Sequence, residues 1–153
     1  MPALQNKQPL FTSQPILVSL QFDPEIPTTL RNPGIDNRTT IYTDETSNGT
    51  LITKITVNAT ALIGDNVTTK VIYIGVSDPD NTTYSLYASK VMTGISGLTS
   101  TDVVPYVEFT FGNGLVTKQG SRIVIAASTD QETTGENGDQ ISVIVEGGTY
   151  DAI

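Results

Sequence analysis

Apolar and polar residues alternate along much of the chain, and a period of two is typical of a β-strand with one buried face. Residues 139–146 carry the pattern clearly, with apolar side chains at Ile141, Val143 and Val145. The Gly147–Gly148 pair follows and is expected to end the strand. This stretch therefore predicts a strand whose apolar face is turned to a core.

A second apolar strand is predicted just upstream, at residues 121–128. Residues 129–138 between the two strands are polar and rich in turn-forming types. A polar turn between two strands is the pattern of a β-hairpin. We therefore expect residues 114–150 to form a closing hairpin around which the rest of the chain collects.

Six further stretches show strand patterns and are separated by turn residues, such as those at 77–81 and 111–114. The nearly continuous apolar run at 71–76 is typical of a central strand that is covered on both sides. Pro105 places the start of its strand near a sheet edge. The six predicted strands are residues 15–22, 39–43, 51–62, 67–76, 82–92 and 103–112.

Seven or eight strands with no amphipathic helix predict an all-β protein, an antiparallel β-sandwich of jelly-roll or immunoglobulin-like type. The period of the pattern cannot choose between these two topologies. The 24 threonines and the many valines and isoleucines suit a pleated, half-buried surface. We expect one β-sandwich domain at residues 39–153, preceded by an extended N-terminal arm at residues 1–38.

Six of the eight prolines lie in the arm, and prolines spaced in this way favour an extended chain. The arm also carries apolar residues that need a surface to pack on. In one interpretation it packs on its own domain, through a strand at residues 15–22. In the other it docks on a neighbouring subunit. The partner-binding residues would then be Phe11, Ile16, Val18, Leu20 and Phe22.

The chain carries a net charge of −8, and an acidic surface repels phosphate backbones. Nucleic-acid binding is therefore not expected, and no apolar run is long enough to span a membrane. The absence of cysteine and histidine removes the thiolate nucleophile, the commonest general base and the commonest zinc ligand. We therefore expect a protein that is not an enzyme and has no cofactor.

Three groups of residues could still bind a ligand. Asp78, Asp80 and Asn81 offer oxygen ligands at a spacing that suits calcium, although Pro79 fits a plain turn and we favour the turn. The acidic residues between 130 and 139 raise the same question, and a solvated loop is the preferred interpretation. Three tyrosines could stack on sugars, but packing within the sheets is preferred. These are Tyr84, Tyr87 and Tyr106.

The closing part of the chain resembles small bacteriophage virion structural proteins. The likeness rests on an apolar strand that runs into Ala-Ser-Thr, then a polar insertion, a Val/Ile strand and a Gly-Gly-Thr-Tyr ending. Two earlier strands resemble the same family. The likeness covers residues 50–151 and leaves out the arm. The matching stretches are residues 55–60, 71–74, 123–129, 141–145 and 147–150.

The resemblance implies a non-enzymatic structural part of a phage particle, assembled in the host cytoplasm and retained in the virion. A capsid decoration or cement protein is the first expectation, bound to copies of itself and to other virion proteins such as the major capsid protein. A neck, tail or baseplate protein and a host-surface carbohydrate-binding module are the alternatives. We expect a chain that lacks residues 1–30 to fold as a sandwich but to be left out of particles.

Overall fold

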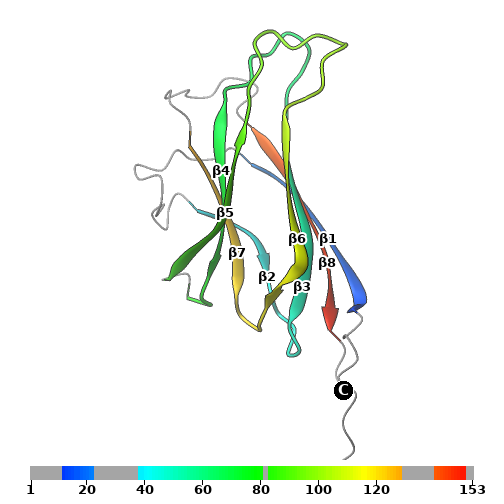
Figure 1. Cartoon of the computed structure of the whole chain (residues 1–153), viewed down its shortest axis with the longest axis vertical. Coiled ribbons are helices and arrows are strands. Elements are labelled where there is room, and N and C mark those ends of the chain that lie inside the picture. Colours follow the sequence, from blue (N-terminus) through cyan, green and yellow to red (C-terminus); the bar gives the residue numbers. More distant parts are fainter. Residues whose placement is uncertain (1–11, 23–37, 81–82, 129–139, 151–153) are drawn as a thin grey trace, which may run out of the picture.

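The computed structural model describes residues 12–22, 38–80, 83–128 and 140–150, and within them the regular structure is entirely β-strand (Figure 1). Each predicted strand has a counterpart, so the expected all-β class is confirmed. The strands are β1 (Thr12–Phe22), β2 (Thr39–Thr43), β3 (Thr50–Ala59), β4 (Lys70–Ser77), β5 (Tyr84–Met92), β6 (Tyr106–Thr117), β7 (Arg122–Ser128) and β8 (Ile141–Tyr150).

Two four-stranded antiparallel sheets form the two layers of a sandwich (Figure 1). Sheet A has the order β1-β8-β3-β6, and sheet B has the order β2-β7-β4-β5. The first half of the chain pairs with the second half in reverse, β1 with β8, β2 with β7, β3 with β6 and β4 with β5. A long hairpin rolled up in this way is a jelly roll. The strand order therefore settles the choice that the sequence left open.

The predicted closing hairpin of β7 and β8 is wrong, because the two strands lie in different sheets. β7 lies between β2 and β4 in sheet B, and β8 lies between β1 and β3 in sheet A. Val143 and Val145 on the inward face of β8 are fully buried, whereas β7 is buried on both faces, with Ile123 and Ile125 on one and Val124 and Ala126 on the other. Periodicity reports which face of a strand is buried but not which strand is its neighbour.

The last strand does not end at Gly147–Gly148, as the sequence suggested, but continues to Tyr150. Gly147 pairs with Ile16 of β1 on one side and with Ile52 of β3 on the other. A Cβ atom on Gly147 would lie 2.2 Å from the carbonyl oxygen of Leu51. The glycine therefore permits a close approach of two backbones inside the strand, at a point where the register with β3 shifts.

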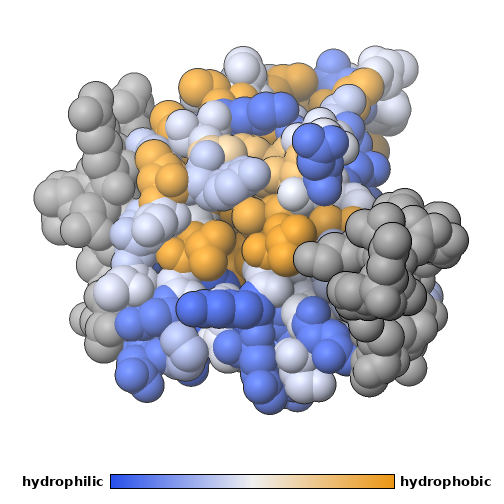
Figure 2. All heavy atoms as spheres, turned by 60° about the horizontal axis from the view of Figure 1, so that its bottom comes forward, coloured by the Kyte–Doolittle hydropathy of each residue, from blue (hydrophilic) through white to orange (hydrophobic). Residues whose placement is uncertain are grey.

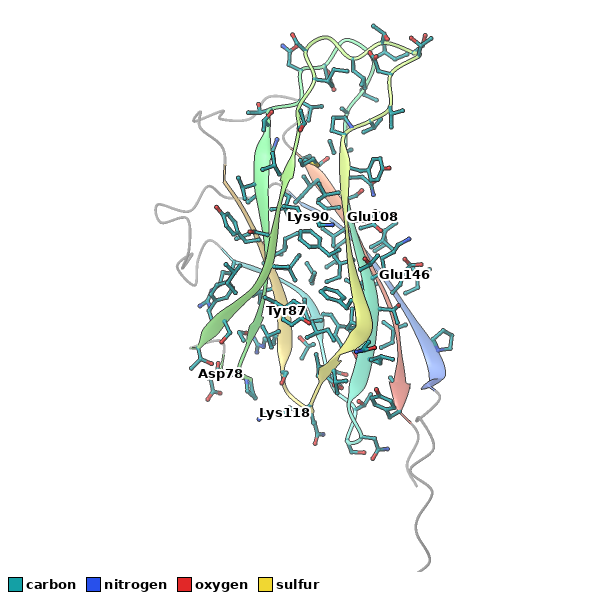
Figure 3. All side chains as sticks on the ribbon, in the orientation of Figure 1. Asp78, Tyr87, Lys90, Glu108, Lys118 and Glu146 are labelled. Carbon is teal, nitrogen blue, oxygen red and sulfur yellow. The ribbon has the colours of Figure 1, made fainter. Side chains whose placement is uncertain are left out.

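The core lies between the two sheets and is filled by the inward face of each strand (Figure 3). Ile55 and Val57 of β3 face Ile72 and Ile74 of β4, and all four side chains are fully buried. Burying a side chain of this size stabilises the folded state by about 1.5–3 kcal/mol. β4 is an inner strand of sheet B and Tyr73 is also buried, so the predicted central strand at 71–76 is confirmed.

β1 belongs to the sandwich, although the sequence placed it in the arm. It pairs with β8 from Thr12 to Phe22, and Val18 and Leu20 pack against the core of the same chain. The strand predicted at residues 15–22 is therefore confirmed and begins earlier, whereas a domain boundary at residue 38 would cut sheet A. Residues 1–11 and 23–37 of the expected arm lie outside the described residues.

Candidate interaction surfaces

The residues predicted to bind a partner divide between β1 and the undescribed part of the chain. Ile16, Val18 and Leu20 lie half-buried on the inward face of β1. Phe11 lies outside the described residues, and Phe22 ends β1 with a side chain that is not described. Three of the five side chains therefore face their own domain, and binding of a partner through the arm stays a prediction.

The candidate calcium loop holds a turn in the described residues. The backbone N–H of Thr83 donates to Oδ1 of Asp78 at 3.2 Å, and Asp80 is exposed. Asn81 and the acidic loop at 130–139 lie outside the described residues. Within the described ranges, no three His, Cys, Asp or Glu side chains come together in a way that could hold a metal ion. Nor does any helix there have the length and apolar character needed to cross a bilayer.

The three tyrosines differ in their surroundings. Tyr84 is half-buried, with its ring against Gly75 and the guanidinium of Arg38 5.1 Å from the ring centroid. Tyr87 packs edge-on against Phe111 with 5.2 Å between ring centroids, yet it remains half exposed. Tyr106 is 53% exposed at the start of β6. The preferred packing role therefore holds for Tyr84 and Tyr87, and Tyr106 is the most exposed of the three.

β6 is the outer strand of sheet A and has no strand partner on its far side among the described residues. The N–H of Ala59 in β3 donates to the carbonyl of Pro105 at 2.9 Å, and peptide groups alternate in direction along a strand. The peptide groups of Tyr106, Glu108 and Thr110 consequently point away from β3. Pro105 was correctly predicted to mark an edge strand.

A side chain from the other sheet reaches this open edge. Nζ of Lys90, in β5, donates a hydrogen bond to the carbonyl oxygen of Glu108 at 2.5 Å. The same ammonium lies 5.6 Å from the ring centroid of Phe109. Figure 3 shows Lys90 and Glu108 next to each other on β5 and β6 at the middle of the molecule. Lys90 therefore covers one of the outward-pointing peptide groups of β6.

A trough runs beside the open edge of β6 in two parts that share Tyr106. The lower part has a volume of about 490 Å³ and carries the polar side chains of Lys90, Glu108 and Thr110, and the upper part has a volume of about 330 Å³ and is mainly apolar. Among the upper walls, Val103 is 75% exposed. The trough thus lies along unpaired peptide groups and has side chains of two kinds. Its main walls are Lys90, Glu108 and Thr110 below, and Val91, Ile95, Val103 and Pro105 above.

The outer face of sheet A carries an ion-pair group next to this edge. Nζ of Lys54 lies 3.5 Å from Glu108 and 3.4 Å from Glu146, so one lysine serves two glutamates. The hydrogen bond to Glu146 and the negative charge of Glu108 raise the pKa of Lys54 above its usual value. The group keeps one uncompensated negative charge on an exposed surface. Because it is exposed, salt screens it strongly.

Two connecting loops, residues 60–69 and 93–105, project together beyond one end of the sheets (Figure 1). Two backbone hydrogen bonds join the loops. The N–H of Gly64 donates to the carbonyl of Leu98 at 2.7 Å, and the N–H of Leu98 donates to the carbonyl of Asp65 at 2.9 Å. Leu62 and Ile63 lie in the turn before Gly64 and are more than 70% exposed. This exposed loop was not among the predicted sites. Its signal in the sequence is the apolar pair directly before Gly64–Asp65.

Other apolar side chains also reach the surface. Figure 2 shows apolar atoms gathered across the middle of the face that it presents, above a band of hydrophilic atoms. Tyr87, Asp78 and Lys118 lie at the lower end of the β5–β6 side in Figure 3, around a hollow of about 400 Å³. Its walls mix hydroxyls, one carboxylate and one ammonium with the apolar side chains of Val76 and Leu86.

A buried carboxylate holds the end of the sandwich opposite the projecting loops. Asp44 is fully buried, and its carboxylate accepts hydrogen bonds from Thr46 (2.9 Å from the backbone N–H and 2.6 Å from the hydroxyl) and from the hydroxyl of Thr117 (2.7 Å). Burial alone would raise the pKa of Asp44, but these hydrogen bonds outweigh it and hold the pKa below its usual value. The group is satisfied within the protein and has a structural role.

The sequence matches no model of a known protein family and no curated protein. Function is therefore inferred from the topology and from the surfaces described above.

Proposed function

We propose that the protein is a non-enzymatic structural component of a bacteriophage virion, a capsid decoration or cement protein. The observation that carries the proposal is the jelly-roll strand order of the two sheets. Eight-stranded jelly rolls recur in viral capsid proteins, which is support by analogy of fold. The resemblance of residues 50–151 to small phage virion proteins points in the same direction.

The arm would bind neighbours from a fixed anchor. β1 begins at Thr12, where it pairs with Tyr150 at the edge of sheet A, and it is bonded to β8 along its whole length. Residues 1–11 precede this anchor and contain Leu4, Leu10 and Phe11. We therefore place the clasping segment in residues 1–11, with Phe11 as the member of the predicted partner-binding set that precedes the sandwich.

A host-surface carbohydrate-binding module is the second candidate, since jelly rolls also form lectin domains. The observation that favours it is the exposed ring of Tyr106, together with the hollow beside Tyr87, whose walls include hydroxyl and charged side chains. Aromatic rings of this kind can stack on sugar faces. A neck, tail or baseplate location would use the same clasping mechanism as a capsid location.

The proposal is tested on particles. An antibody raised against the purified chain would be applied to phage particles from the source, and the bound antibody would be located by immunogold electron microscopy. Label spread over heads supports a capsid protein, and label confined to tails supports the neck, tail or baseplate alternative. Particles without label, combined with binding of the chain to host-surface glycans on an array, would replace the proposal by the carbohydrate-binding module.

A further inference from the structure

The open edge of β6 presents a row of peptide groups ready to pair with another strand. Tyr106, Glu108 and Thr110 point theirs away from β3, over a stretch of five residues. An added strand can bond to such a row, with affinity from the main chain and selectivity from side-chain pockets. A single lysine, Lys90, protects this edge among the described residues. Natural edge strands are often protected against pairing by charged side chains of this kind.

We propose that this edge is the docking site for residues 1–11 of a second copy of the chain, which add as a strand to sheet A beside β6. The inference rests on the proposed function, because it names the surface that the clasping arm of a neighbour would occupy. It assigns a role to the trough between β5 and β6 and to Lys90.

The length of the arm fits the trough. Eleven residues in extended form span up to about 36 Å, at roughly 3.3 Å per residue. The open edge from Tyr106 to Thr110 needs about five residues, or roughly 17 Å. The remaining residues of the eleven serve as the link to Thr12 of the second copy, where β1 begins.

The composition of the arm also fits. Residues 1–11 carry two leucines separated by a mostly polar run, and the trough has apolar side chains at Ile95 and Val103 next to the polar side chains of Lys90 and Glu108. Because side chains alternate along a strand, Leu4 and Leu10 share one face of an extended segment and Lys7 lies on the other. The face with a leucine can enter the apolar part between Ile95 and Val103.

Charge favours the same occupant. Residues 1–11 hold Lys7 and no acidic side chain, whereas the whole chain has a net charge of −8. The outer face beside β6 keeps one uncompensated charge, because Lys54 serves both Glu108 and Glu146. A lysine on the outer face of the added strand would lie opposite this group. Docking of a second folded domain would instead bring two acidic surfaces together.

The absence of native cysteine allows a direct test by disulfide trapping in the full-length chain. Chains with Leu4→Cys or Leu10→Cys would each be mixed with chains carrying Val103→Cys in a glutathione buffer. The variant that is trapped tells whether the added strand runs parallel or antiparallel to β6. The control partner is Leu17→Cys, which is 73% exposed on β1 at the other edge of sheet A. We expect a mixed dimer with Val103→Cys to form roughly tenfold more readily than with Leu17→Cys, as effective concentration predicts for docked segments.

A second variant tests the peptide groups themselves. Glu108→Pro removes an N–H that points away from β3, so pairing with β3 is kept, and proline is tolerated at such edge positions. Glu108→Ala is the matched control for loss of the side chain. We expect light scattering to show weaker self-association by roughly tenfold for Glu108→Pro relative to Glu108→Ala, because a strand bond is lost and the ring obstructs the edge.

The outcomes separate this inference from the proposed function. Trapping at Val103 together with a loss of association in Glu108→Pro supports the docking site. Association that is abolished by removing residues 1–11, but without trapping at Val103, overturns the docking site and leaves a clasp elsewhere. A chain that stays monomeric in all variants and gives no trapped dimer overturns the inference as well, while the labelling of particles decides the function independently.

Discussion

Asp44 shows how one side chain can join distant parts of the chain. Its carboxylate binds Thr46 in the loop after β2 and Thr117 at the end of β6, while its backbone bonds to Gly120 and Ser121 in the following turn. The carboxylate is fully buried and Thr117 is buried too, so the hydroxyl of Thr117 would be left without water as a replacement. We therefore expect removal of the Asp44 carboxylate to cause a large loss of stability for a single polar side chain.

We predict that Asp44→Ala lowers the free energy of unfolding by about 1–3 kcal/mol, because the buried hydroxyl of Thr117 loses its acceptor. Urea titration followed by tyrosine fluorescence measures the change. Asp102→Ala is the control, since Asp102 accepts similar hydrogen bonds from Thr99 but is exposed. Equal losses in the two variants would show that burial of Asp44 does not matter.

The lowered pKa of Asp44 also predicts a pH dependence. Because the pKa is lower in the folded than in the unfolded state, the stabilisation is fully present above the unfolded value, about 3.9. It is lost as the pH falls through the folded value. We expect the urea midpoint of the unsubstituted chain to fall more between pH 7 and pH 3 than that of Asp44→Asn, and an equal fall would contradict the assignment.

Gly147 is a second position where a single added atom, a Cβ, is expected to change the stability of the fold. We predict that Gly147→Ala destabilises the fold by about 1–3 kcal/mol, since the new methyl group would overlap the backbone at Leu51. Gly112→Ala is the matched control, because no atom lies within 4 Å of its Cβ position. Thermal unfolding by circular dichroism compares the two, and a similar melting temperature for both would contradict the steric reason.

At the scale of single elements, β1 determines which truncation can test the arm. It covers the edge of β8 and places Val18 and Leu20 against the core. Removal of residues 1–30 would therefore delete an edge strand of sheet A together with the arm. The sequence-based expectation that the sandwich survives this deletion has to be revised, because it treated β1 as part of the arm.

We predict that deletion of residues 1–11 leaves the urea midpoint unchanged, whereas deletion of residues 1–30 lowers stability by several kcal/mol. The reason is the loss of two half-buried apolar side chains, each worth about 1.5–3 kcal/mol when fully buried. Solution mass by light scattering on the shorter deletion then reports on the arm without damage to the sandwich. Equal stability of the two deletions would show that β1 is dispensable.

At the scale of the whole molecule, the jelly roll brings the two halves of the chain together in reverse order. β1 pairs with β8 and β2 with β7, so many contacts join residues far apart in the sequence. Such contacts require closure of long loops before they can stabilise anything, which slows folding. The same topology places β5 and β6, consecutive in the chain, at adjacent edges of different sheets.

We predict refolding on a timescale of milliseconds to seconds, as is typical of two-state proteins dominated by long-range contacts. Stopped-flow dilution from urea, followed by tyrosine fluorescence because the chain has no tryptophan, measures the rate. Refolding within microseconds would contradict a transition state that depends on pairing the two ends of the chain.

The sequence by itself determined that the strands exist and about where they lie, although β6 runs through the predicted turn at 111–114 to Thr117. The buried face of β8 was predictable from the alternation at Ile141, Val143 and Val145, and the burial of β4 from the apolar run at 71–76. Burial of one face is a local property with a period of two. Pro105 at the start of an edge strand was predictable for a similarly local reason, since proline cannot donate to a central strand. The jelly-roll and immunoglobulin-like orders share these local signals.

The tertiary structure alone decided which strands are neighbours and what their edges offer. β7 and β8 follow each other in the sequence yet lie in different sheets. β1, which was expected to belong to the arm, pairs with the edge of β8 instead. The trough beside β6 likewise joins Lys90 and Val103 to Glu108 through pairing choices that no local pattern encodes. Strand partners depend on how all the apolar faces pack together. For this reason the sequence pattern predicted the strands but not the surface between β5 and β6.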